Sequence, residues 1–318
     1  MKITRSKKAI IVESKLWSRR VLLDPRKRLR EDDLVVTTHG HGDHMPSSNL
    51  YGEVICSDIT GKMILFYKPK SKIECTERYE DNDILITLHD AGHSLGSRMM
   101  LLEDKHNGEK LLYTGDYNTL SKYCGKAEPI DCDLLIVDST YGNKRFRFPR
   151  YEEEIHRMLG YIRKYIKEEI PLIINTYSFG KPQEICSILQ DNRIGFSVDN
   201  KIKQVNQQID CNFSMEGRNS NIFITRRLQR TKDKQKIIAV SGHAMSPFLY
   251  KMRDIDESFV ISDHADYPSG IEFVRDCNPR RVFTVFGHEN DFARSIREEL
   301  NAESLPLMPN QSILDDFW

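Results

Sequence analysis

The chain has 318 residues, enough to bury a substantial core in one large or two ordinary domains. Its 47 basic and 47 acidic residues balance, which excludes an overall basic field as a sign of a nucleic-acid partner. The polar first eight residues and the lack of a long apolar run argue against a signal peptide and a membrane partner, and we expect a cytoplasmic protein.

Local composition is less even than these totals. Basic residues cluster at 26–30, 144–150 and 226–236, and each cluster taken alone is typical of an ordinary solvated face. The seven cysteines are scattered without a C-x-x-C pair, which indicates reduced and mostly buried thiols.

The first 140 residues have the pattern of strands separated by turns. Short apolar segments predict strands at 9–12, 21–23, 34–37, 84–88, 99–102, 111–113 and 134–137. Polar residues of the kinds that bind metals follow several of these segments. That arrangement is expected where loops at one edge of a sheet build a site.

The middle of the chain changes character. Apolar residues at helical spacing predict a helix over 151–170, and a buried strand at 171–175 followed by a helix over 181–189 predicts a parallel β-loop-α unit. Residues 191–236 are polar and show no clear period, and strands resume from residue 237. We therefore expect a discontinuous first domain, residues 1–140 and 255–318, interrupted by a small α/β insert at 141–254.

The loop after the apolar segment 34–36 carries four ligand-type side chains within six residues. These are His39, His41, Asp43 and His44. Imidazole and carboxylate are the ligands that Zn²⁺ takes, and open catalytic sites gather them on loops at strand ends. A glycine-punctuated loop would let His39 and His41 face one metal while Asp43 and His44 turn toward a second.

Two further strand ends carry ligand-type residues. His93 lies in a glycine-flanked loop, and Asp116 comes directly after the strand 111–113. The combination predicts a site for two Zn²⁺ ions, with Mn²⁺ as a possible substitute. His39, His41 and His93 would hold one ion, Asp43 and His44 would hold the other, and Asp116 would bridge them.

These residues resemble the metallo-β-lactamase fold, whose H-x-H-x-D-H motif matches 39–44 and whose next two metal motifs match His93 and Asp116. The chain also resembles the nucleic-acid branch of that fold, the β-CASP family. Asp138 lies in a segment similar to motif A, His264 in a segment similar to motif B, and 176–181 looks like the loop-to-helix turn of the insert. The resemblance implies an α/β fold, an αββα sandwich with an inserted β-CASP domain, and a nuclease activity.

The expected chemistry is hydrolysis of a phosphodiester. Two Zn²⁺ ions would activate a water molecule near neutral pH and neutralise the phosphate oxygens. His264, oriented by Asp138, is the expected proton donor to the departing oxygen. Asp43 is also an expected catalytic residue, as a ligand of the second metal.

Two turns of the insert are expected to hold phosphates of the substrate. Backbone amides at the start of the helix 181–189 form the first, with Ser178, Gly180 and Lys181. Ser241 and Gly242 form the second, a glycine turn similar to the family's connection from the insert to the core.

One motif departs from the family pattern. RNA-cleaving members carry a metal-binding histidine before a glycine near the end of the first domain, where this chain has Phe286. DNA-cleaving members of the Artemis type resemble this chain in having an apolar residue there. His288 is a candidate replacement ligand, because positions 286 and 288 share a face in an extended strand.

The last eight residues, 311–318, fit the box by which replication and repair proteins bind the PCNA sliding clamp. A short 3₁₀ turn would gather Leu314, Phe317 and Trp318 into a plug anchored by Gln311. We therefore expect a nuclease acting on DNA in repair or replication, associated with the nucleoid in an archaeal-type cell. The alternatives are an RNA-processing or RNA-decay nuclease of the same chemistry, a small-molecule hydrolase, and an inert clamp-binding scaffold.

Overall fold

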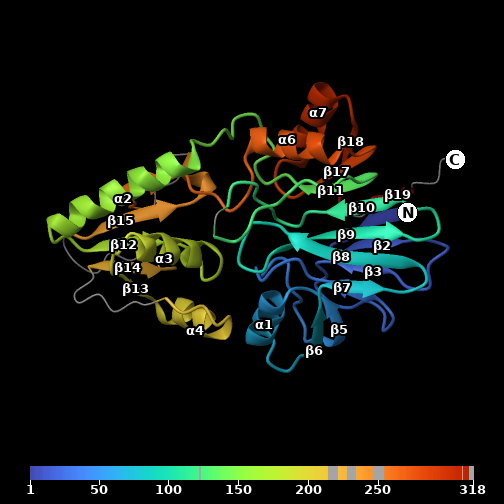
Figure 1. Cartoon of the computed structure of the whole chain (residues 1–318), viewed down its shortest axis with the longest axis horizontal. Coiled ribbons are helices and arrows are strands. Elements are labelled where there is room, and N and C mark those ends of the chain that lie inside the picture. The colour runs from blue at the N-terminus through green and yellow to red at the C-terminus, as the bar shows by residue number, and fades with distance from the viewer. Residues whose placement is uncertain (122, 214–220, 228–233, 246–253, 310, 315–318) are drawn as a thin grey trace. The chain divides into compact units, whose positions relative to one another are not determined.

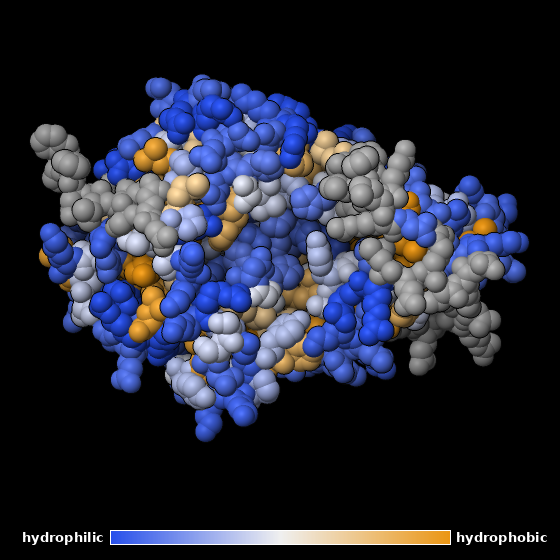
Figure 2. Space-filling model, turned by 180° about the vertical axis from the view of Figure 1, so that it is seen from behind, coloured by the Kyte–Doolittle hydropathy of each residue, from blue (hydrophilic) through white to orange (hydrophobic). Residues whose placement is uncertain are grey.

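A computed structural model describes the chain except for residues 122, 214–220, 228–233, 246–253, 310 and 315–318. The chain forms two compact units, one of Met1–Phe146 with His264–Trp318 and one of Arg147–Asp263. Among the described residues, every helix is too short or too polar to cross a membrane. On the face shown in Figure 2, hydrophilic residues predominate and hydrophobic ones lie in small separate groups.

Two mixed sheets build the first unit (Figure 1). In spatial order the first sheet contains β19 (Gln311–Leu314), β1 (Lys2–Arg5), β2 (Ile10–Glu13), β3 (Val21–Leu23), β4 (Leu34–Val36), β5 (Tyr51–Ile55) and β6 (Lys72–Thr76). The second sheet, also in spatial order, contains β18 (Glu303–Pro306), β17 (Arg281–Val285), β11 (Leu134–Asp138), β10 (Lys110–Tyr113), β9 (Arg98–Asp104), β8 (Ile84–Asp90) and β7 (Arg78–Glu80).

The core of this unit lies between the two sheets. Val36 of the first sheet and Leu111 of the second belong to one buried hydrophobic cluster. Because successive side chains of a strand point to opposite faces, Leu112 lies on the outer face. There it belongs to a second buried cluster with Ile271 of α6 (Tyr267–Cys277) and Ile296 of α7 (Glu289–Leu300). With α1 (Asp58–Tyr67) packed beside β6, the layers are those of the expected αββα sandwich.

The second unit is a parallel sheet with helices. Its strands, in spatial order, are β13 (Ser197–Val198), β14 (Ile222–Thr225), β12 (Leu172–Asn175), β15 (Lys236–Val240) and β16 (Glu257–Phe259). Its helices include α2 (Tyr151–Lys167), α3 (Lys181–Asp191), α4 (Asn200–Gln208) and the 3₁₀ turn η1 (Gly242–Met245). β16 pairs with β15, and this unit runs from Arg147 to Asp263. Residues 255–263, expected in the first domain, therefore lie in the second unit, and residues 141–146, expected in the insert, lie in the first. The predicted fold class, a sandwich with an α/β insert, is confirmed.

Strand direction brings the ligand-bearing loops together in the first unit. β10, β11 and β17 are parallel, and β8 runs the same way as β10 because both are antiparallel to β9. The carboxyl ends of these strands therefore meet at one edge of the sheet. A bond of 2.9 Å from Arg98 N–H to Thr38 O joins the loop after β4 to this edge.

Candidate metal centre

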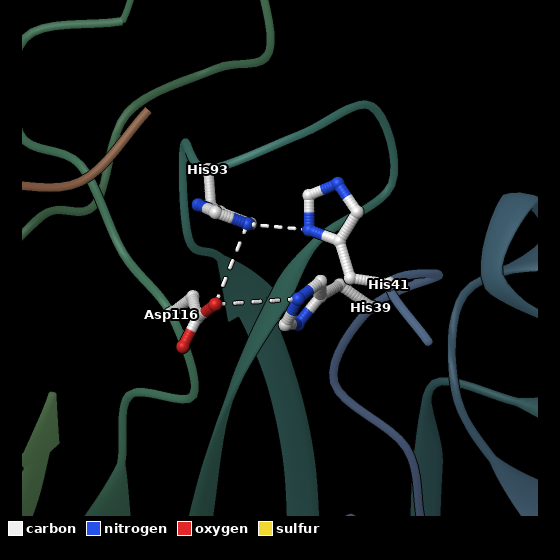
Figure 3. Close-up of side chains that lie close together, drawn as sticks. All are labelled: His39, His41, His93 and Asp116. Atoms are coloured by element: carbon white, nitrogen blue, oxygen red, sulfur yellow. Dashed lines mark hydrogen bonds and ion pairs between the residues drawn. The ribbon is translucent and has the colours of Figure 1, made fainter. Parts of the chain in front are cut away.

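Four predicted ligands converge in the first unit (Figure 3). One ligand atom from each of His39, His41, His93 and Asp116 lies within 4.8 Å of the other three. Nε2 of His39 and Nε2 of His93 are each 3.5 Å from Oδ2 of Asp116, and Nδ1 of His41 is 2.8 Å from Nε2 of His93. This His/Asp cluster is able to bind a metal ion.

The surroundings of His39 prepare it for a metal. Burial, together with the neighbouring His44, lowers the pKa of His39 well below its usual value, so the ring is neutral. The Thr38 hydroxyl donates to Asp24, so it accepts from Nδ1–H of His39, 3.0 Å away. That leaves the lone pair on Nε2, which is buried without a hydrogen bond among the described residues. Three imidazoles and a carboxylate, with this nitrogen lone pair directed into the group, are a set of ligands that fits Zn²⁺.

Gly115 allows Asp116 to approach this loop. Its φ is +53°, and a Cβ there would lie 2.7 Å from Oγ1 of Thr38. Glycine alone tolerates both the backbone conformation and the contact. The glycine therefore fixes Asp116 beside His39.

A second group shares Asp116 with the first. Asp116, Asp138 and His264 also offer ligand atoms within 4.8 Å of one another. Oδ2 of Asp138 lies 2.8 Å from Nδ1 of His264, and its Oδ1 accepts bonds of 2.8 Å and 2.7 Å from the N–H and hydroxyl of Thr140. Nε2 of His264 lies 3.9 Å from Oδ2 of Asp116. The carboxylate of Asp138 thus directs Nε2 of the imidazole toward the His/Asp cluster.

His44 reaches the same carboxylate from the other side. Its Nε2 lies 3.3 Å from Oδ1 of Asp116, and its Nδ1 lies 2.8 Å from Oδ2 of Asp24. Asp24 was missed at the sequence level. It also accepts bonds from Thr38 N–H at 2.7 Å and from the Tyr113 hydroxyl at 2.8 Å. The signal that could have found it is a carboxylate directly after β3, because β3 pairs in parallel with β4 and the histidines lie in the loop after β4.

The charged groups of this site are paired with one another. Burial disfavours the charged form of His44, but Asp116 and Asp24 outweigh it and raise the pKa well above its usual value. Burial likewise opposes ionisation of Asp116, but His44 and His264 hold the pKa of this carboxyl well below its usual range. Without metal, His44 is therefore a cation held between two carboxylates.

Asp43 lies at the rim of the site. Its side chain is 82% exposed, and Oδ2 is 4.0 Å from Nε2 of His44. The structure does not bring it into either ligand group. Its assignment as a ligand of the second metal stays a prediction.

The sequence predicts that Phe286 and His288 lie on one face of an extended strand. In the structure they do not. β17 ends at Val285, and Phe286 has φ +64°, so the chain turns away from the extended conformation. The ring of Phe286 packs on that of His44, with centroids 5.0 Å apart, and lies under the guanidinium of Arg5. Nδ1 of His288 lies 3.6 Å from Oδ2 of Asp291, and His288 belongs to neither ligand group.

The two turns of the insert that are predicted to bind phosphates follow neighbouring parallel strands, β12 and β15, so they lie at one edge of that sheet. Gly180 caps α3 with φ +85° and follows Ser178 in the first turn, while Ser241 and Gly242 open the second. The side chain of Lys181, however, is buried. It bonds to Glu184 and lies 3.4 Å from Asp263, so two carboxylates, rather than an open phosphate position, surround its ammonium group.

The first four residues of the predicted clamp-binding box form the strand β19. Gln311–Leu314 pair antiparallel with the whole of β1, from Arg5↔Gln311 to Lys2↔Leu314. These residues therefore have an extended conformation instead of the predicted 3₁₀ turn. Phe317 and Trp318 lie outside the described residues.

Comparisons with known proteins point to one group of enzymes, although no family model matches. The chain is 27% identical over 284 residues to a probable DNA ligase of Opitutus terrae, covering 82% of this chain and 27% of that protein. It is 29% identical over 216 residues to an RNase J-like protein of Methanocaldococcus jannaschii, covering 57% and 51%. It is 32% identical over 123 residues to the cleavage and polyadenylation specificity factor subunit 3 of Dictyostelium discoideum, covering 38% and 15%.

The matched parts of these relatives are only pieces of longer proteins. The chain spans about half the length of the RNase J-like protein and about a quarter of the ligase. A solved structure, of a protein of unknown function from Enterococcus faecalis V583, has the same fold with a TM-score of 0.67 at 11% identity, covering 98% of this chain and 99% of that one. The chain thus has the metallo-β-lactamase fold with a β-CASP insert, and its homologues are the β-CASP nucleases together with proteins named as DNA ligases.

Proposed function

We propose that this protein is a metal-dependent nuclease that hydrolyses phosphodiester bonds of DNA in repair or replication. The observation that carries the proposal is the shared carboxylate of Asp116, which joins the His39, His41 and His93 cluster to the His264–Asp138 pair. Two Zn²⁺ ions, or Mn²⁺, bound by these residues with His44 and Asp43 would activate water and neutralise charge on the phosphate.

The protein's own side chains do the remaining work. Asp138 holds His264 with Nε2 toward Asp116, from where the imidazole can deliver a proton to the departing oxygen. Thr38 and Asp24 fix the rings of His39 and His44 in the orientations that metal binding requires. Asp43 is exposed, with Oδ2 4.0 Å from Nε2 of His44, and would join that ring in holding the second ion.

Two observations favour DNA over RNA. Phe286 occupies the place where RNA-cleaving members carry a histidine, and it packs on His44. The similarity to the protein named as a DNA ligase covers 82% of this chain, more than the similarity to the RNase J-like protein. The names of the RNase J-like protein and of the cleavage and polyadenylation factor favour RNA instead. A nuclease of RNA processing or decay stays the alternative.

A substrate panel separates these possibilities. Purified protein with Zn²⁺ or Mn²⁺ is offered 5′-phosphorylated single-stranded, flap and fork DNA, and RNA of the same sequences, beside an Asp116→Asn variant. We expect faster cleavage of DNA by the wild type and none by the variant. Faster cleavage of RNA would replace the proposal by its alternative, and equal inactivity of both proteins on all substrates would leave only a binding role.

We further propose that residues 311–318 recruit the enzyme, in the cytoplasm and at the nucleoid, to a sliding clamp. Because Gln311–Leu314 pair with all of β1, removing the whole segment would also expose a sheet edge. The better variant combines Phe317→Ala with Trp318→Ala, which leaves β19 in place. We expect it to lose clamp binding in a pull-down while cleaving DNA normally; undiminished binding would remove the clamp from the proposal.

A further inference from the structure

A pocket of about 300 Å³ lies against the metal-binding loop in the first unit. Resting on the proposed nuclease function, we propose that it binds one nucleobase of the substrate strand, from a nucleotide next to the one that is cleaved. The residues that matter for this role are Arg26, Gly42, Met45, Ile64, Tyr67 and Lys68.

The backbone of the metal-binding loop forms one wall of this pocket. Gly42 stands between His41 and Asp43 in the chain, and Met45 follows directly after His44. The guanidinium of Arg26 joins the two positions, donating to Gly42 O at 2.6 Å and to Met45 O at 3.3 Å. Because this wall and the ligands His41 and His44 belong to one loop, we infer that a strand with a phosphate at the metal site can place a neighbouring nucleotide in the pocket.

The chemistry of the lining fits a planar base attached to a phosphate. Met45 and Ile64 are buried and supply an apolar floor, and Tyr67, 36% exposed, supplies an aromatic ring. Arg26 and Lys68 supply positive charge, and none of the lining residues is acidic. Aromatic rings beside cations are how proteins hold single-stranded nucleic acid without reading its sequence. The volume is at the small end for ligand pockets, which suits one base.

Tyr67 also sits where it can be changed without disturbing the fold. It is the last residue of α1, and its helix is anchored outside the pocket by the buried Thr60 and Met63. Tyr51, on β5, is a matched control because it is 57% exposed and does not line the pocket.

The test measures binding of a fluorescent, cleavage-resistant phosphorothioate DNA strand by anisotropy. We expect Tyr67→Ala to raise Kd about tenfold, as the loss of one base–aromatic stack does, while Tyr67→Phe and Tyr51→Ala bind like the wild type. Strands with one abasic site at successive positions then locate the base. At one position the abasic site is expected to raise the Kd of the wild type about tenfold and to leave the Kd of Tyr67→Ala unchanged.

Several outcomes would overturn the inference. An unchanged Kd for Tyr67→Ala would do so, as would abasic strands that affect both proteins equally at every position. Competition by a free nucleoside monophosphate with no abasic effect would make the pocket a site for free nucleotides. Failure of the nuclease proposal is distinguishable, because it shows as absent cleavage of ordinary DNA while the Tyr67-dependent binding persists.

Discussion

Oδ2 of Asp24 lies 2.8 Å from Nδ1 of His44, which directs Nε2 of that ring toward Asp116. Carboxylates in this position fix the tautomer of a metal-binding histidine and commonly contribute 10–100-fold to metal affinity. Asp24→Asn should therefore weaken binding of the second metal by about this factor, measured by competition with a chromophoric chelator. Tyr113→Phe, which removes one bond to Asp24, is the milder control. Equal affinity in Asp24→Asn and wild type would contradict a role for the carboxylate.

His264 should act in protonation of the leaving group. His264→Gln is expected to lower kcat on DNA by about 10²–10⁴-fold, the usual contribution of a general acid. An aryl phosphodiester, whose leaving group needs no proton, should be cleaved almost normally by the same variant. A structural role would reduce both rates alike.

His288→Gln serves as the matched control for that experiment. His288 lies near Asp291 and belongs to neither ligand group, so metal content and kcat should stay at the wild-type level. Loss of one metal on this substitution would instead restore His288 as a ligand.

Phe286→His should tighten the second metal site. The ring at this position packs on His44, so an imidazole there would add a nitrogen ligand beside it. The backbone has φ +64°, a conformation that histidine adopts more readily than phenylalanine does, so the substitution adds no backbone strain. We expect at least about tenfold tighter binding of the second metal by calorimetry. Phe286→Leu, which adds no ligand, should not show it; the same gain in both variants would point to a packing effect.

Metal uptake at His44 should release a proton. Asp116 and Asp24 raise the pKa of this ring well above its usual value of about 6.5, against the effect of burial. In the metal-free protein the charged ring therefore contributes stability that is fully present below pH 6.5 and is lost as the pH rises through the folded pKa.

A metal competes with that proton, so the second equivalent of Zn²⁺ should bind more tightly as the pH rises. His39, whose pKa is lowered by burial and by His44, is already neutral, and the first equivalent should be less sensitive. Calorimetry in buffers of different ionisation enthalpy counts the protons. Equal proton release for both equivalents would contradict this assignment.

Most of the metal cluster could be predicted from sequence because its signals are local. His39, His93 and Asp116 each follow a short apolar strand, and parallel strands bring such ends together. His264, the partner of Asp138, is 126 residues away in the chain. It could be predicted only from the resemblance to the β-CASP family. The αββα architecture was likewise predicted from the resemblance to the metallo-β-lactamase fold.

Features that depend on tertiary contacts could not be predicted from the sequence. Asp24 meets His44 only because β3 and β4 pair, and Lys181 is enclosed by Glu184 and Asp263, which is 82 positions later in the chain (263 − 181). The turn at Phe286 overrides the strand pattern that the sequence suggested. In 191–236, α4 begins at a cap made by Asp199 to the amides of Lys201 and Ile202, within a segment whose apolar period is weak.

Asp116 belongs to both ligand groups, so its carboxylate should be essential for metal-dependent cleavage of nucleic acid. The direct measurement is cleavage of end-labelled single-stranded DNA by chelator-stripped wild type and Asp116→Asn protein as Zn²⁺ or Mn²⁺ is added back. We predict that only the wild type gains activity and that the gain tracks the metal bound per chain. Cleavage by the stripped protein, or equal cleavage by the variant, would contradict the assignment.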